Sequence, residues 1–422
     1  MLLTHRRSSA TLLIVAVAAG SLLTGCASSD SSSPAASESA AEVSVDLPTK
    51  PMSQADADAF DKAIQGVLDD PASQAELAPG TWVGVWVPEK GYFMKAYGNA
   101  TLDGQPAALD QHLRIGSVSK TFTATAVLML VDDGKLSLDD TVADVLPDTA
   151  SAYPVYAGVT VEQLLRMQSG VPDFLNVPNG LVNDVAKDPT RMFTVDDILT
   201  SATSNTTAPA GTIGYSSTNY IVLEEMVNKV SGTTLQEFIA DRITGPLGMN
   251  NTELPDYEIR ALPEPSARGY ATGPADGLEG CRAEFALLGG EVEQDADLSE
   301  YTQSLTRGAG AMSSTVADLG IWSASKSGNV LLSEELQGKR LQITPDIFLN
   351  YGMGIMEVPS ESGLTFLGHE GDAFGYQAYA LKEPTSGASV VVMNNTCGLA
   401  GLMDKIVAAL PLPAASASPA TS

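Results

Sequence analysis

The amino-acid sequence predicts an α/β (α+β) fold, in which one antiparallel sheet is built from both ends of the chain and flanked by helices. Strand-like segments occur near both ends, within residues 81–97 and 364–393. The stretch between them, from about 118 to 249, has mostly helical spacing of its apolar residues. Strands at both ends with helices between them favour a single sheet with an inserted, mostly helical region.

Composition indicates a globular protein with a sizeable core. The chain has 422 residues, of which 44% are hydrophobic, enough for one large or two moderate domains. The formal net charge of -28 repels phosphate groups and argues against binding to nucleic acid. The three cysteines and three histidines form no Cys-x-x-Cys or Cys/His cluster, so a zinc site is not predicted.

The first 25 residues have the pattern of an export signal. Arg6 and Arg7 precede an apolar run over residues 11–23 that is too short for a confident transmembrane helix. The run ends in Leu-Thr-Gly-Cys, which resembles the bacterial lipobox. We therefore expect Cys26 to be lipidated and the mature chain to be extracytoplasmic, lipid-anchored to the cell membrane. An ordinary cleaved signal peptide that happens to end near a cysteine is the alternative.

Two further segments are predicted to lie outside the fold. Residues 26–52 are Ser, Ala, Pro and acidic residues with almost no bulky apolar groups, so we expect a flexible tether. Residues 411–422 have a similar composition and are predicted to be a disordered tail.

The folded part is predicted to begin with a helix over residues 55–68 and a hairpin whose strands cover residues 81–87 and 92–97. Further helices are expected over residues 121–131, 160–167, 194–202, 219–230 and 235–243.

The rest of the chain returns to strands. Residues 271–300 are rich in Gly, Asp and Glu and are predicted to form a long loop. Strands are expected over residues 364–368, 375–382 and 388–393, followed by a helix over 399–410. The sheet part would then comprise residues 53–117 and 300–410, and the mostly helical part with its acidic loop residues 118–299.

A Ser-x-x-Lys pattern lies at the strand-to-helix turn within residues 114–122. Ser117 would sit near the start of a helix, where backbone N–H groups favour a developing negative charge. Lys120 would lie on the same side one turn later, and a lysine whose pKa is lowered can take the serine proton. A second copy, Ser323 to Lys326, follows a helical pattern and is expected to be the solvated end of a short helix.

Two later stretches contain candidate partners of Ser117. In the first, the hydroxyl of Tyr215 could transfer protons as a phenolate or a relay, and Ser217 could hydrogen-bond the substrate or Lys120. The alternative is an ordinary turn, in which Tyr215 packs on the core and Ser217 or its neighbour caps a helix.

The second stretch is a glycine-rich strand beginning at His369. Glycines on a strand indicate close approach by backbone or ligand, so Gly371 would lie next to the nucleophile. The N–H of Asp372 could pair with that of Ser117 as an oxyanion hole. His369 would offer a donor or a positive charge to a substrate carboxylate; the alternative is a solvated histidine at a strand end.

Taken together, these motifs resemble those of the serine β-lactamase and penicillin-binding protein superfamily, most closely secreted D-alanyl-D-alanine carboxypeptidases and class C β-lactamases. The family's Ser-x-x-Lys, Tyr-x-Asn and Lys-Thr-Gly (or His-x-Gly) motifs correspond here to Ser117/Lys120, Tyr215/Ser217 and His369/Gly371. The stretches 131–140, 163–173 and 246–249 also look like the family, and the likeness covers residues 55–410. A β-lactamase-like fold is therefore expected.

The sequence differs from the family's motifs at two places, and both differences affect substrate binding more than the nucleophile. Ser217 replaces the usual asparagine, so a side-chain amide that would hold the substrate is missing. Glu370 and Asp372 place carboxylates beside a site meant for an anion; Glu370 should point to the face opposite His369, whereas Asp372 has no evident role.

The resemblance implies two-step acyl transfer on Ser117 that needs no metal or organic cofactor. The simplest such enzyme is a membrane-tethered D-alanyl-D-alanine carboxypeptidase acting on cell-wall peptides. A class C-like β-lactamase acting on β-lactams, an esterase on the same fold, and a non-catalytic ligand-binding surface lipoprotein remain alternatives. A monomer is expected. Cys281 and Cys397 could pair outside the cytoplasm, but nothing in the sequence brings them together, and free buried thiols are equally open.

Overall fold

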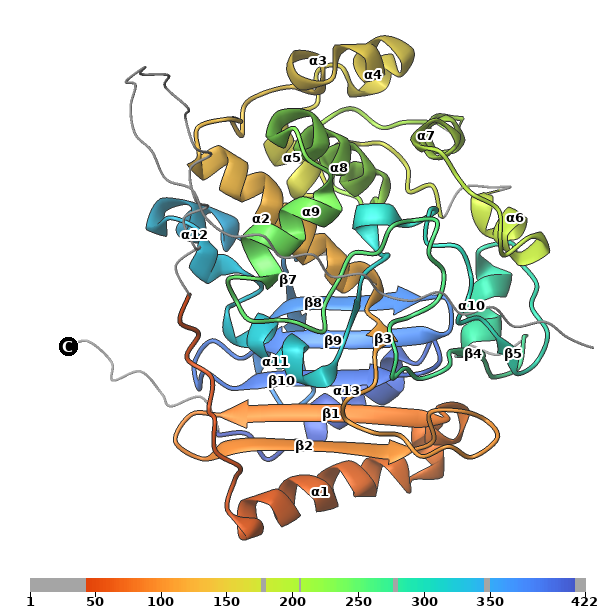
Figure 1. Ribbon diagram of the computed structural model, residues 1–422, viewed down its shortest axis with the longest axis vertical. Coiled ribbons are helices and arrows are strands. Elements are labelled where there is room, and N and C mark those ends of the chain that lie inside the picture. The colour runs from red at the N-terminus through yellow and green to blue at the C-terminus, as the bar shows by residue number, and fades with distance from the viewer. Residues whose placement is uncertain (1–42, 176–179, 205, 276–279, 345–349, 414–422) are drawn as a thin grey trace, which may run out of the picture. The chain divides into compact units, whose positions relative to one another are not determined.

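A six-stranded antiparallel sheet is the central element of the computed structural model (Figure 1), which describes residues 43–413 except 176–179, 205, 276–279 and 345–349. The strand order is β2-β1-β10-β9-β8-β7. The strands are β1 Gly80–Val87, β2 Gly91–Gly98, β7 Met356–Pro359, β8 Thr365–Ala373, β9 Tyr376–Lys382 and β10 Ser389–Asn394. Both ends of the chain supply strands to one sheet, which confirms the predicted fold class.

Strand β1 joins the two ends of the chain. It pairs with β2 on one side and with β10 on the other, from Thr81 opposite Asn394 to Trp86 opposite Ser389. Every residue of β1 is buried, and alternate side chains enter two different cores. When both faces of a sheet are covered, the sequence of an inner strand is nearly continuously apolar, and the sequence of β1 has this character.

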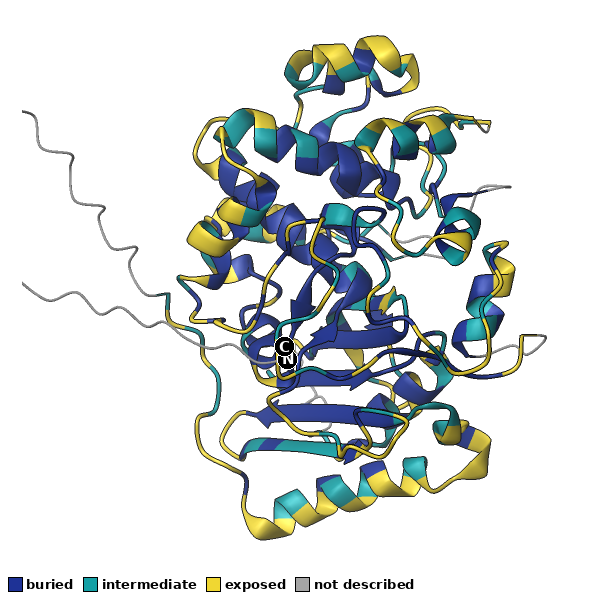
Figure 2. Cartoon of the chain, turned by 45° about the vertical axis from the view of Figure 1, so that its right-hand side comes forward, coloured by how far each residue is buried: buried dark blue, intermediate teal, exposed yellow. Residues whose placement is uncertain are grey.

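Helices cover both faces of the sheet (Figure 1). Helix α1 (Gln54–Leu68) and helix α13 (Ala400–Ala409) share one core with the sheet, and α1 keeps an exposed outer side (Figure 2). On the other face lie α2 (Ser119–Asp132) and α11 (Val316–Ala324). Every residue of α2 from 119 to 130 is buried, so α2 is a central helix with protein on all sides.

The remaining helices lie in the inserted region, except α12, which follows α11. They are α3 Val142–Val145, α4 Pro147–Ala152, α5 Val161–Leu165, α6 Leu181–Lys187, α7 Val195–Thr203, α8 Thr218–Ser231, α9 Leu235–Ile239, α10 Cys281–Leu287 and α12 Glu334–Arg340. Two small sheets pair β3 Leu113–Arg114 with β6 Ser313–Ser314 and β4 Tyr270–Ala271 with β5 Ala296–Asp297. The long loop predicted over residues 271–300 was therefore wrong in part, because its short elements leave no visible hydrophobic period.

A disulfide joins Cys281, the first residue of α10, to Cys397, which follows β10. Their Cα atoms lie 4.4 Å apart although 116 residues separate them in sequence. The structure thus resolves the alternative that the sequence left open, in favour of a pair.

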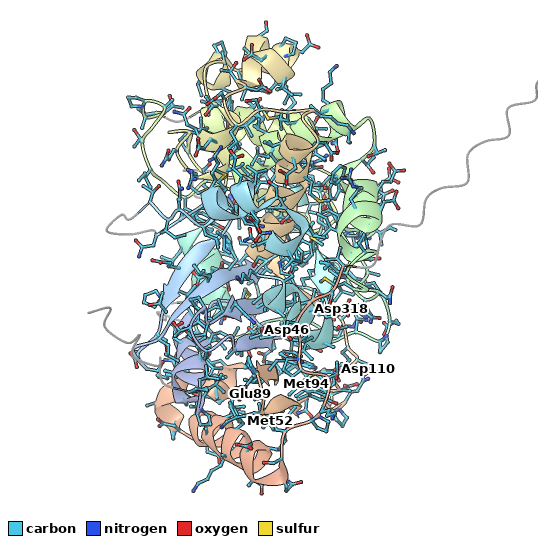
Figure 3. All side chains as sticks on the ribbon, turned by 90° about the vertical axis from the view of Figure 1, so that its left-hand side faces the viewer. Asp46, Met52, Glu89, Met94, Asp110 and Asp318 are labelled. Atoms are coloured by element: carbon cyan, nitrogen blue, oxygen red, sulfur yellow. A yellow bond between two sulfur atoms is a disulfide. The ribbon has the colours of Figure 1, made fainter. Side chains whose placement is uncertain are left out.

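The end of the predicted tether packs against the fold. The amide of Met52 donates to the carbonyl of Tyr92 at 2.9 Å, and the amide of Val43 donates to the carbonyl of Pro246 at 3.3 Å. Figure 3 shows this segment between Asp46 and Met52, beside the β1–β2 hairpin. The prediction of a flexible segment up to residue 52 was therefore wrong for residues 43–52, where Val43, Val45 and Leu47 add apolar contacts.

The predicted signal peptide, Cys26, the tether before residue 43 and the tail from residue 414 lie outside the described residues. Within the described ranges, no helix combines the length and apolar character needed to cross a membrane.

Candidate active site

Ser117 lies in a tight turn, Gly116–Val118, that leads from β3 into α2. It is the one residue between 111 and 130 that is not fully buried. The turn is fixed from within, because the hydroxyl of Ser119 donates to the carbonyl of Gly116 at 2.7 Å and accepts from the amide of Met312 at 3.2 Å. The fold therefore holds a single hydroxyl at the accessible end of a buried helix.

Lys120 lies beneath Ser117 and is 1% exposed. Its Nζ is 2.9 Å from Oγ of Ser117 and 2.8 Å from the carbonyl oxygen of Ala309. Burial lowers the pKa of Lys120 to about 7, and the negative charge of Asp173 opposes that shift in part. A substantial fraction of this lysine is thus a neutral amine near pH 7, able to accept the proton of Ser117 while donating to Ala309.

Tyr215 completes this group of three. Its ring centroid lies 5.1 Å from Nζ of Lys120, and its hydroxyl hydrogen-bonds the side chain of Ser117. Desolvation raises the pKa of Tyr215 well above its usual range, against the opposing effect of that hydrogen bond. Of the two predicted forms, the geometry therefore favours a neutral phenol that relays protons over a phenolate.

Ser217 has a different partner from those predicted. Its hydroxyl donates to Oδ2 of Asp173 at 3.1 Å, and it makes no side-chain cap to α8. Asp173 is 5% exposed and also accepts from the amide of Leu175 at 3.0 Å. Burial raises the pKa of Asp173, while Leu175, Lys120 and Ser217 lower it. The structure thus places a buried carboxyl beside the Ser117–Lys120 pair, which sequence reasoning missed because a turn aspartate gives no sign of its burial.

Glycines at 116 and 371 let strand β8 lie directly against the Ser117 turn. A Cβ on Gly371 would stand 2.2 Å from the carbonyl oxygen of Ile115 and 2.6 Å from the amide nitrogen of Ser117. A Cβ on Gly116, whose φ is +50°, would stand 2.2 Å from the carbonyl oxygen of Asp372. No side chain fits at either position without moving backbone, which explains the predicted close approach.

The amide of Asp372 points toward this contact. The hairpin between β8 and β9 closes with Ala373 opposite Tyr376, so its loop has two residues and this closing pair is hydrogen-bonded. The next pair, Asp372 with Gln377, is then a non-hydrogen-bonded pair. The N–H and C=O groups of Asp372 therefore point away from β9. The side away from β9 is the one next to Gly116 and Ser117. Two backbone N–H groups can therefore converge there on an oxyanion.

His369 is buried and neutral, which differs from the predicted donor or positive charge. It is 1% exposed, and burial, followed by the charge of Lys120, lowers its pKa to about 3. Nδ1 hydrogen-bonds the carbonyl of Glu370, so Nδ1 carries the proton and Nε2 accepts from the hydroxyl of Tyr351 at 2.9 Å. The ring packs within 6.3 Å of the Tyr215 ring, centroid to centroid, and so acts as packing and hydrogen-bonding support. Tyr351 was not predicted, since no motif marks it.

The neighbouring carboxylates have clear positions. Glu370 pairs with Tyr379, whose ring belongs to the core beneath α13, so it points to the face opposite His369 as predicted. Asp372 accepts from the amide of Gly398 at 3.0 Å and from Nε2 of Gln377 at 3.3 Å. Its carboxylate therefore lies at the end of β8, away from Lys120.

The second Ser-x-x-Lys copy is not arranged for the same chemistry. It lies at the end of α11, as predicted, but Ser323 is 1% exposed rather than solvated. Lys326 is exposed and has a φ of +55°, which turns the chain away from the helix. Among the described residues, no cluster of three or more His, Cys, Asp or Glu could hold a metal ion.

Comparison with known proteins agrees with this arrangement. The family model described as Beta-lactamase matches residues 60–407. Penicillin-binding protein 4* of Bacillus subtilis is 26% identical over 297 residues, covering 69% of this chain and 62% of that protein. A D-aminopeptidase of Cereibacter sphaeroides is 27% identical over 350 residues, covering 81% of this chain and 60% of that protein. The chain thus spans about three fifths of the length of these two relatives.

A solved structure shows the same fold. The D-stereospecific amidohydrolase from a Streptomyces species superposes with a TM-score of 0.70 at 24% identity, covering 83% of this chain and 98% of that one. The family match covers most of the chain, and the relatives that match include penicillin-binding proteins and D-aminopeptidases. The chain therefore belongs to the beta-lactamase family, a serine hydrolase family that also includes penicillin-binding proteins.

Proposed function

We propose that this protein is an exported, lipid-anchored serine hydrolase that cleaves amide bonds following a D-amino acid residue through an acyl-enzyme on Ser117. The observation that carries the proposal is the 2.9 Å contact between Oγ of Ser117 and Nζ of Lys120, a buried amine whose pKa lies at about 7. The relatives named for D-aminopeptidase and D-stereospecific amidohydrolase activities support the class of bond.

Each step follows from the positions of these side chains. Neutral Lys120 takes the proton of Ser117 as Oγ bonds to the substrate carbonyl carbon, and the N–H groups of Ser117 and Asp372 stabilise the oxyanion. As the C–N bond breaks, the proton on Lys120 passes through Tyr215 to the leaving amine. Water then attacks the ester with Lys120 as its base, which releases the carboxylic acid and restores Ser117.

The D-alanyl-D-alanine carboxypeptidase expected from the sequence is the second candidate, because His369 and Gly371 form the His-x-Gly motif beside Ser117. That substrate carries a C-terminal carboxylate, which calls for a cation. His369 does not supply one, since its pKa is lowered to about 3. Neutral His369 therefore favours a leaving group without a carboxylate, as in an amidase or an aminopeptidase.

Intact-protein mass spectrometry tests the nucleophile of the acyl-enzyme. The full-length chain is incubated with a fluorophosphonate, a serine-directed reagent without a carboxylate, beside Ser117→Ala and a control, Ser323→Ala, which alters the other Ser-x-x-Lys copy. A stable added mass on the wild type and on Ser323→Ala, but not on Ser117→Ala, is expected. An adduct that survives Ser117→Ala would overturn the assignment of the nucleophile.

Rates on three substrates then separate the remaining candidates. A D-amino acid amide, D-alanyl-D-alanine and a cephalosporin are supplied to the same preparation. Faster hydrolysis of the amide is expected, and faster release of D-alanine from the dipeptide or rapid loss of the cephalosporin would select the carboxypeptidase or the β-lactamase. For the anchor, Cys26→Ser should move the protein from the membrane fraction to the medium.

A further inference from the structure

A small cavity lies beside the end of strand β8 and contains two carboxyl groups. Its volume is about 60 Å³. Its walls come from β8, α6, α10 and Cys397 after β10, and include Leu175, Val182, Glu284, Phe285, Asp372 and Phe374. Besides the two acids, Gln303 and Thr306 are the polar lining residues and the others are apolar, which makes an unpaired negative charge costly.

Glu284 points its free oxygen into this environment. Its Oε2 atom is shielded from solvent and has no hydrogen-bond partner among the described residues. Burial, and then the charge of Asp372, raise the pKa of Glu284 well above its usual range. Asp372 is an exposed residue whose carboxylate accepts hydrogen bonds from Gly398 and Gln377, and desolvation by the protein packed around it raises its pKa. Among the described residues no cation pairs with either carboxyl group. A bound cation would reduce the repulsion between them and give Oε2 of Glu284 a partner.

Two aromatic rings, Phe285 and Phe374, line part of the cavity, and Tyr301 packs behind them. The ring centroids of Phe285 and Phe374 lie 5.5 Å apart, and that of Tyr301 lies 5.6 Å from Phe374. The faces of such rings attract a cation, most strongly where water is excluded. A cavity of about 60 Å³ has room for roughly two water molecules at about 30 Å³ each, and hence for an ammonium group.

The position of the cavity indicates which part of a substrate would reach it. The proton for the leaving amine comes through Tyr215, whose ring packs against His369 near the middle of β8. The leaving group therefore lies at the His369 end of the strand edge. The acyl part must extend the other way from Ser117, past the outward-facing amide of Asp372, toward Phe374 and the cavity.

We propose that this cavity binds a primary ammonium group carried by the acyl part of the substrate, with Glu284 and Asp372 as its acceptors. The inference rests on the proposed acyl-enzyme hydrolysis and names its substrate class. The disulfide helps to hold the two carboxyl groups near each other. Cys281 is the first residue of the helix that carries Glu284, and Cys397, which lines the cavity, precedes Gly398, the residue that donates to Asp372. The ammonium can be the α-amino group of the acyl residue or a more distant side-chain amine.

Two matched pairs of p-nitroanilides test the proposal with the full-length chain at neutral pH. D-Alanyl and N-acetyl-D-alanyl p-nitroanilide differ in an α-ammonium group. N-Acetyl-D-lysyl and N-acetyl-D-norleucyl p-nitroanilide differ in a distal one. The ratio of kcat/KM within each pair is measured. In one pair the cationic member should be favoured by about tenfold, as expected for a charge pair in which one acceptor oxygen of Glu284 is shielded while Asp372 is exposed.

The variant Glu284→Gln should bring that ratio close to one. Glu291→Gln, at an exposed position soon after α10, should leave it unchanged. If Glu284→Gln fails to fold, the wild-type ratios still decide the matter. Ratios at or below one in both pairs, with the neutral members cleaved, would overturn the ammonium site and leave the proposed function standing. No cleavage of any of the four would overturn both.

Discussion

Oη of Tyr351 lies 2.9 Å from Nε2 of His369, and the other nitrogen of the same ring donates to the carbonyl of Glu370. The imidazole is 1% exposed, so both of its polar atoms are satisfied inside the protein. Protonation would place a second positive charge near Lys120 and would remove the acceptor that Tyr351 uses. The hydrogen bond from Tyr351 therefore favours neutral His369, whereas the sequence alone suggests a cation at this position.

The first prediction is that His369 does not titrate between pH 5 and pH 8. The pKa of this ring is lowered to about 3, chiefly by burial, so it is neutral throughout that range. Long-range ¹H–¹⁵N NMR of the imidazole rings measures this, with His369→Asn identifying the signal. A midpoint near 6.5 would contradict the structure.

Tyr351→Phe is the companion variant. It leaves Nε2 of buried His369 without a donor, which should lower the free energy of unfolding by about 1–3 kcal/mol. Urea unfolding of the two proteins measures the difference.

The second prediction concerns the pH dependence of acylation. Lys120 must be a neutral amine to accept the proton of Ser117, and its pKa lies at about 7. The acylation rate should therefore rise about tenfold per pH unit below pH 7 and become level above it. Stopped-flow release of p-nitroaniline from the preferred substrate measures the profile, and a rate independent of pH between 5 and 9 would rule out Lys120 as the base.

Asp173→Asn should shift that profile toward lower pH. The negative charge of Asp173 stabilises the protonated form of Lys120, so removing it makes the neutral amine available at lower pH. Asp148→Asn, at an exposed site on α4, is the control and should not move the midpoint. A shift toward higher pH in Asp173→Asn would show that Asp173 acts on Lys120 in some other way.

The third prediction is that Gly371→Ala disables the site. The added Cβ would stand 2.2 Å from the carbonyl oxygen of Ile115 and 2.6 Å from the amide of Ser117, so β8 and the turn must separate. Losing one oxyanion donor typically costs about a hundredfold in kcat, and the displaced backbone should cost about 1–3 kcal/mol of stability.

The control for this substitution is Gly66→Ala on the exposed side of α1. No atom lies within 4 Å of the Cβ built there, so this change should raise stability by about 0.5–1 kcal/mol and leave kcat unchanged. Wild-type kcat in Gly371→Ala would contradict the tight contact between β8 and the turn.

Sequence reasoning located the sheet and the core of the site because both follow from local patterns. Strands β1 and β10 are largely continuous apolar runs, and β2 and β9 are apolar stretches interrupted by Lys95 and Gln377. Ser117 and Lys120 lie one helical turn apart. Gly371 was also identified, since a glycine on a strand signals close approach and the structure supplies the reason.

The other site residues could not be predicted because they depend on contacts between segments distant in sequence. Asp173 accepts a hydrogen bond from Ser217, 44 residues later, and Tyr351 hydrogen-bonds His369 although no motif marks its position. The state of His369 follows from burial, which a single histidine in a sequence does not reveal. Helix α10 was missed because its seven residues are too few for a clear hydrophobic period, so the disulfide that begins it and the carboxyl of Glu284 were missed as well.

The fourth prediction concerns that disulfide. Cys281 and Cys397 close a loop with a sequence separation of 116 residues, so their bond restricts the unfolded chain strongly. Replacing both by alanine should lower the free energy of unfolding by about 2–5 kcal/mol. Urea unfolding under oxidising and reducing conditions measures this, and the reductant should weaken the wild type while leaving the double variant unchanged.

The activity of the double variant on p-nitroanilides shows which part of the site the disulfide positions. Ser117 and Lys120 belong to one continuous turn and helix, so acylation by neutral substrates should persist in the folded double variant. Glu284 follows Cys281 by less than one helical turn, so α10 should lose its fixed position relative to Asp372. Preference for the cationic p-nitroanilide should therefore fall when the disulfide is absent. An unchanged preference would mean that packing around Phe285 alone is enough to place Glu284.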